Sequence, residues 1–109
     1  MAFEHVWSAL QHELRMGDTI PNWTQAKGLV GQPFVVLEVT PTAITVDPGR
    51  GAISQRVPER DFEYLDRSWS GYRSGRIGRG ELRNGTRFSK YTISLLHWLE
   101  ERHGGTLPG

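Results

Sequence analysis

Near the beginning of the chain, apolar residues recur at intervals of three and four positions. This spacing places them on one face of a helix and leaves the polar residues on the other face. It predicts an amphipathic helix over residues 1–16, which Gly17 ends. The residues of this apolar stripe are Phe3, Val6, Trp7, Leu10 and Leu14.

In the middle of the chain, apolar residues occur at every second position, which is the period of a half-buried strand. The turn sequence at residues 48–51 and the short connections favour an antiparallel meander within residues 33–57. The expected strands are residues 34–39, 43–47 and 52–57. The expected inward-facing residues are Val35, Leu37 and Val39 in the first strand, Ile44 and Val46 in the second, and Ile53 and Val57 in the third.

Helical spacing returns over residues 58–103. Pro58 suits the first turn of a helix that runs to about Arg73. Trp69 and Tyr72 lie on the apolar stripe of this helix, so both are expected in the core. The residues expected to be most deeply buried are Leu37, Ile44, Val46, Phe62, Trp69, Leu95 and Leu99.

Two shorter signals complete the predicted fold. A short helix fits residues 79–84, and Ser89 can cap a final helix. One face of the sheet must be covered, and the helices are the available cover. The predicted fold is therefore α+β, a small antiparallel sheet of three or four strands packed by an N-terminal helix and two C-terminal helices. Residues 1–109 are expected to form a single domain.

Composition narrows the class of protein. The 109 residues include no cysteine, which excludes disulfides and thiolate zinc sites. The N-terminus lacks the basic start and apolar run of a signal peptide. The longest apolar run, residues 34–37, is too short to cross a membrane. The expectation is a soluble, cytoplasmic protein without a membrane partner.

The histidines do not follow a metal-binding pattern. His5 and His12 are seven positions apart, which is about 10 Å along a helix and too far for one shared metal ion. Nor does His12–Glu13 continue into the His-Glu-x-x-His pattern of zinc proteases. We therefore expect no metal and no cofactor. No motif combines a nucleophile with an acid or a base, so the protein is not expected to be an enzyme, although a small nuclease-like activity stays open.

Charge is unevenly distributed along the chain, although the net charge is only +1. Residues 67–90, here called the basic block, hold seven basic residues and one acidic residue, whereas the rest holds six basic and eleven acidic residues. This segregation, concentrated in the loop region 73–90, favours binding to nucleic-acid phosphates. The alternative is that the arginines pair with Glu59, Glu63 and Asp66. The expected nucleic-acid-binding residues are Arg73, Arg76, Arg79, Arg83, Arg87, Lys90, Tyr91 and Thr92.

Part of the basic block carries a spaced pattern of polar and apolar residues. The pattern consists of Glu81–Leu82, Thr86, Phe88–Ser89 and Thr92–Ile93–Ser94. Through it, residues 79–102 resemble the helix-turn-helix of winged-helix regulators. The resemblance implies that Leu82 and Phe88 pack two helices together and that Thr92 faces a DNA groove. The sequence departs from the family pattern at the turn, where Arg87 replaces a glycine.

Two function hypotheses follow from these observations. The first is a non-enzymatic nucleic-acid-binding module or accessory protein that binds DNA or RNA through an arginine-rich surface. The whole chain also loosely resembles small uncharacterised bacterial modules found on mobile elements or attached to defence proteins. The second hypothesis is a protein-interaction or small-ligand-binding module, which could be a homodimer through the aromatic stripe of its N-terminal helix.

Overall fold

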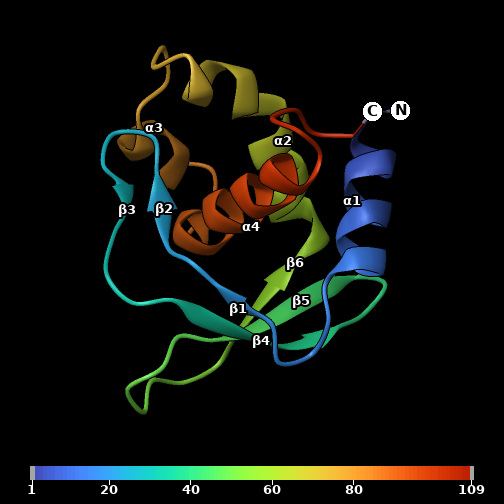
Figure 1. Ribbon diagram of the computed structural model, residues 1–109. Helices are drawn as coiled ribbons and strands as arrows, with labels where there is room; N and C mark the ends of the chain where they lie inside the picture. The colour runs from blue at the N-terminus through green and yellow to red at the C-terminus, as the bar shows by residue number, and fades with distance from the viewer. Residues whose placement is uncertain (1, 109) are drawn as a thin grey trace.

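Four helices and six strands form the part of the chain that the computed structural model describes, residues 2–108 (Figure 1). The helices are α1 (Ala2–Glu13), α2 (Glu59–Arg73), α3 (Arg79–Arg83) and α4 (Ser89–Arg102). The strands are β1 (Thr19–Ile20), β2 (Trp23–Thr24), β3 (Gly28–Leu29), β4 (Phe34–Val39), β5 (Ala43–Asp47) and β6 (Gln55–Pro58). The first and last residues of the predicted domain, 1 and 109, lie outside the described residues.

The strands form two antiparallel sheets. The larger sheet has the order β1-β4-β5-β6, and β2 and β3 pair with each other as a separate hairpin. Strands β4, β5 and β6 are the predicted meander, and β1 adds a fourth strand at its edge. Figure 1 shows this sheet at one end of the molecule, with the helices on one side of it. The predicted α+β fold is therefore confirmed.

A β-bulge interrupts β4 and changes which of its residues face the core. Val36 pairs with Val46 and Glu38 pairs with Thr45, so Leu37 between them has no cross-strand partner. The extra residue reverses the alternation, because each position after a bulge faces the opposite side. Phe34 and Val36 are buried before the bulge, so the predicted inward positions of Val35 and Leu37 are wrong, and Leu37 is 38% exposed. After the bulge, Val39 packs against the core, as predicted.

The third predicted strand also begins later than expected. Ile53 is 82% exposed in the loop before β6, and only Val57 from this segment reaches the core. Pro58 is the last residue of β6 and the N-cap of α2, not a residue of its first turn. The helix itself ends at Arg73, as the spacing predicts.

Helix α4 lies at the centre of the fold (Figure 1). It packs against α2, α3, β1 and β2, so most of its length is enclosed by protein. Six of the seven predicted core residues are buried, the exception being Leu37. The six are Ile44, Val46, Phe62, Trp69, Leu95 and Leu99.

The N-terminal helix turns its apolar stripe inward. Val6, Leu10 and Leu14 are 3% exposed or less, and the indole of Trp7 packs on Phe62 of α2 with ring centroids 5.3 Å apart. The Trp7 indole N–H also donates to the carbonyl of Pro41, at 3.1 Å. The stripe is therefore part of the core, with Phe3 half-buried at its edge. The helix ends at Glu13, three residues earlier than predicted.

The connection between α3 and α4 differs in detail from the prediction. Helix α3 ends at Arg83, and Ser89 is the first residue of α4 instead of its cap. The N-cap is Phe88, whose backbone N–H is accepted by the hydroxyl of Thr86 at 3.0 Å. Gly85 is required here, because a Cβ at this position would lie 2.0 Å from Cζ of Tyr64.

Candidate functional site

The structure divides the basic block among several surroundings instead of gathering it on one surface. Arg73 forms an ion pair with a buried carboxylate, Arg79 and Lys90 line one pair of cavities, and Arg83 and Arg87 line another cavity. The division arises because the block runs from the end of α2 through α3 into α4, and these helices face different parts of the molecule.

Arg73 is engaged within the protein. Its Nε lies 3.0 Å from a carboxylate oxygen of Glu100, which is 5% exposed. The other oxygen of Glu100 accepts the indole N–H of Trp69 at 2.9 Å. Arg73 also donates to the side-chain oxygen of Gln25 and lies over the ring of Trp23, 4.9 Å from its centroid. These contacts join α2, α4 and the β2–β3 hairpin, so Arg73 stabilises the fold.

The acidic residues of α2 are the alternative partners expected for the arginines. Among residues 2–108, no ion pair joins the basic block to Glu59, Glu63 or Asp66. Burial, followed by repulsion from Glu63, raises the pKa of Asp66 above its ordinary value. The remaining cations of the block are thus not neutralised by the preceding helix.

Four exposed arginines surround a cavity of about 510 Å³. We call this site the arginine hollow; its arginines are Arg56, Arg60, Arg83 and Arg87. They come from β6, from the first turn of α2, from the end of α3 and from the connection to α4. Asp61 is the one acidic residue of the lining, and it is only 8% exposed. The hollow therefore presents a concentrated positive charge to solvent.

The arginines of the hollow make few contacts of their own. Within residues 2–108 none of them is in an ion pair. Arg56 donates to the hydroxyl of Thr42 at 3.3 Å, and the guanidinium of Arg87 lies 4.8 Å from the ring centroid of Phe88. Arg56 and Arg60 lie outside the basic block, so the charge count along the chain missed them. Only the pairing of β6 with β5 and the start of α2 bring them beside Arg83.

A second candidate site lies between the β2–β3 hairpin and α3, which Figure 1 shows side by side. Two adjoining cavities, of about 260 and 470 Å³, share Thr24, Val30 and Arg79 in their linings. We call them together the hairpin groove. The other charged residues of the groove are Lys90 in the smaller cavity and Lys27 in the larger one. All charged side chains of this site are therefore basic.

The hairpin is held to the helices through Trp23. Its ring stacks on the imidazole of His97, with centroids 3.8 Å apart and planes 5° apart. Its backbone N–H donates to the hydroxyl of Ser94 at 3.0 Å. One residue beyond β2, the backbone N–H of Gln25 donates to the hydroxyl of Tyr72 at 2.9 Å. These contacts fix the wall of the groove that the hairpin supplies.

The remaining predicted site residues fall outside both sites. Arg76 is exposed, and Tyr91 is half-buried with its ring edge-on to Phe34 at 5.2 Å. Thr92 is fully buried, and its hydroxyl donates to the carbonyl of Phe88 at 3.0 Å. A side chain in this position cannot touch a base edge, so the prediction that Thr92 reads DNA is wrong. The error arises because α4 is the central helix of the core. A recognition helix, in contrast, has to be exposed on the surface to enter a DNA groove.

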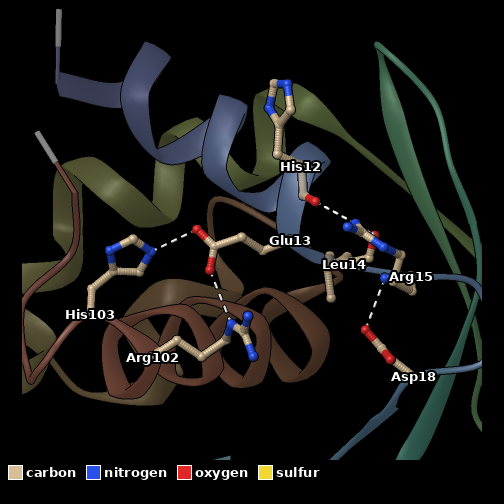
Figure 2. Close-up of polar contacts among 7 residues, drawn as sticks. All are labelled: His12, Glu13, Leu14, Arg15, Asp18, Arg102 and His103. Carbon is tan, nitrogen blue, oxygen red and sulfur yellow. Dashed lines mark hydrogen bonds and ion pairs between the residues drawn. The ribbon is translucent and has the colours of Figure 1, made fainter.

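One further polar cluster joins the ends of α1 and α4 (Figure 2). The carboxylate of Glu13 accepts from Nε of Arg102 at 3.0 Å and lies 2.7 Å from Nε2 of His103. Burial opposes ionisation of Glu13, but these two partners outweigh it, so the pKa of Glu13 lies below its ordinary value. Neither Glu13 nor His103 lines the arginine hollow or the hairpin groove. The cluster joins the C-terminal end of α1 to the C-terminal end of α4.

Within residues 2–108, no group of three or more histidine and acidic side chains could hold a metal ion. No helix in that range is both long and apolar enough to pass through a bilayer. Comparison with known proteins adds no relative: no family model, no curated protein and no solved structure matches the chain.

Proposed function

We propose that the protein is a non-enzymatic nucleic-acid-binding module that contacts the sugar-phosphate backbone through the arginine hollow. The observation that carries the proposal is the convergence of Arg56, Arg60, Arg83 and Arg87 on one open cavity. A guanidinium group matches a phosphate in shape and charge, because its N–H groups can donate to two oxygens at once. Four such groups without ion-pair partners are suited to successive phosphates of a polynucleotide.

The walls of the hollow favour contacts to the backbone over contacts to bases. Phe88, the aromatic residue of its lining, is 7% exposed and cannot stack on a base. Thr92, the expected base reader, is in the core. Contacts to phosphates position a protein on nucleic acid without reading sequence. The proposal is therefore for binding that is largely independent of sequence and strongly dependent on salt.

Salt titration of the binding affinity tests this proposal. If four phosphates are contacted on duplex DNA, the slope of log affinity against log salt is about −3.6. The double variant Arg83→Ala/Arg87→Ala is expected to reduce this slope to roughly −1.8 and to weaken binding at low salt by at least about tenfold. The assay is a gel shift with mixed-sequence duplex and single strands at low and physiological salt.

A matched control removes the same charge elsewhere. Arg67 and Arg76 are both exposed and belong to the basic block, but neither lines the hollow. Arg67→Ala/Arg76→Ala is expected to leave the salt slope unchanged. Absence of binding at low salt would overturn the proposal, and so would equal losses in the two double variants. Far-ultraviolet circular dichroism of each variant verifies the fold.

A further inference from the structure

The hairpin groove combines positive charge with an apolar wall, and this pairing defines a ligand class different from a nucleic-acid backbone. We infer that the groove binds a small aromatic phosphate monoester, with the phosphate at Arg79 and the aromatic ring against the apolar wall of the larger cavity. This site shares no lining residue with the arginine hollow, so the inference does not rest on the proposed function.

The charged end of the site is centred on Arg79. Its side chain lines both cavities, so it lies where they meet. Lys90 adds a second cation in the smaller cavity, and Lys27 adds a third in the larger one. Among residues 2–108, no acidic side chain takes part in either lining. Arg79 and Lys90 together carry two positive charges, which complement a dianion, and a phosphate monoester carries about two negative charges at neutral pH.

Arg79 also has an unused hydrogen-bond donor. Its Nε is buried and has no hydrogen-bond partner among the residues that the structure describes. Buried donors are almost always paired, and one left without a partner destabilises a protein. A phosphate oxygen bound to this nitrogen would supply the partner. The same requirement does not apply to the arginines of the hollow, which are exposed.

The other end of the site is shaped for an apolar group. The larger cavity is lined by Ala26, Val30 and Ile77 together with the ring of Tyr72, and its volume of about 470 Å³ lies within the range of small-molecule sites. Ile77 can lie close against α2 because Gly71 lacks a side chain; a Cβ there would lie 2.5 Å from Cδ1 of Ile77. A flat ring fits such a wall better than a hydrated sugar-phosphate chain does.

Isothermal titration calorimetry with phenyl phosphate and adenosine 5′-monophosphate tests the inference. Saturable one-to-one binding of at least one of them is expected, with inorganic phosphate and the uncharged phenol or adenosine each at least about tenfold weaker. Arg79→Gln is expected to weaken binding at least about tenfold, and Lys90→Gln several-fold. No binding of either phosphate ester, or equal affinity for inorganic phosphate, would overturn the inference.

The matched control is Arg83→Gln, which removes one arginine from the hollow and none from the groove. It is expected to leave binding of the phosphate ester unchanged. If it weakens binding as much as Arg79→Gln does, the groove is not the site and the inference fails. Arg79→Gln should in turn leave DNA binding at its original affinity, so the two sites can fail independently. If Arg79→Gln does not fold, Lys90→Gln against Arg83→Gln decides the question.

Discussion

The arginine hollow and the hairpin groove carry similar positive charge but differ in their walls. The hollow is polar, with four exposed arginines and one buried carboxyl group. The groove has Arg79 where its two cavities meet, Lys90 in the smaller cavity, and apolar residues beside Lys27 in the larger one. Charge by itself attracts any anion, whereas the wall decides whether the anion is a hydrated polymer or a compact molecule with an apolar part. The comparison shows why a single count of basic residues cannot define the ligand.

The two sites are also held in different ways. The hollow is built from the ends of β6, α2 and α3, and its shape depends on the tight connection at Gly85. The groove depends on a two-stranded hairpin that is fixed by Trp23 and Tyr72. A short hairpin has little stability of its own, so its position is set by these contacts. Substitutions can therefore disturb either site separately.

Trp23→Ala is expected to have the largest effect and to act on the groove. It removes the stack on His97 and the ring contacts with Trp69 and Tyr72. Because the Trp23 ring is half-buried, the free energy of unfolding is expected to fall by roughly 2–3 kcal/mol. Binding of the phosphate ester should disappear, and DNA binding should persist. Urea denaturation and the two binding assays check this. Retained ester binding would show that the hairpin does not form the groove wall.

Gly85→Ala is expected to act on the hollow. The added Cβ would overlap the ring of Tyr64, 2.0 Å from Cζ, so the ring or the backbone between Arg83 and Arg87 must move. Overpacking of this kind destabilises by about 1–3 kcal/mol. DNA binding should weaken, whereas ester binding in the groove should not. Thermal denaturation with both assays tests it, and the double variant with Tyr64→Ala should restore much of the lost stability.

Tyr72→Phe sharpens the comparison with a smaller change. It removes the acceptor for the backbone N–H of Gln25 but keeps the ring that packs beside Trp23 and Trp69. The loss is expected to be about 1 kcal/mol. Hydrogen exchange should accelerate at Gln25 and in the hairpin, with little change in β4 to β6. Equal acceleration in both sheets would contradict the idea that the hairpin is held separately.

Acidification is expected to loosen the groove side first. Burial, together with the nearby Arg73, lowers the pKa of His97 despite the opposing effect of Glu101. The unfolded chain then binds a proton below about pH 6.5 that the folded protein does not yet bind, so stability falls as the pH falls. The pKa of Glu13 is also lowered from 4.5, so its contribution is lost only at more acidic pH.

A pH series of thermal denaturation separates these two groups. His97→Phe keeps a ring against Trp23 but cannot titrate, so it should flatten the loss of stability that begins as the pH falls below about 6.5. Glu13→Gln should reduce the loss that occurs below about pH 4.5 and leave the first one intact. An unchanged profile in His97→Phe would remove His97 as the cause of the first loss.

Local patterns predicted the elements of this fold well where one side of each element is buried. The spacing of apolar residues gave the inward faces of α1 and α2, because a helix that packs on one core repeats its buried side every three or four residues. The alternation in β4 was misleading, since a single bulged residue, Leu37, reversed it. A bulge is set by pairing with the neighbouring strand, so the sequence of the bulged strand alone does not predict it.

The sequence by itself determined that the basic residues are concentrated in one stretch and that the core is rich in aromatic residues. Only the tertiary structure decided which cations lie together. It paired Arg73 with Glu100, brought Arg56 and Arg60 to Arg83 and Arg87, and placed Lys27 with Arg79 and Lys90. The physical reason is that a charge acts over a few ångströms through space, and distances in space are set by packing between elements remote in sequence.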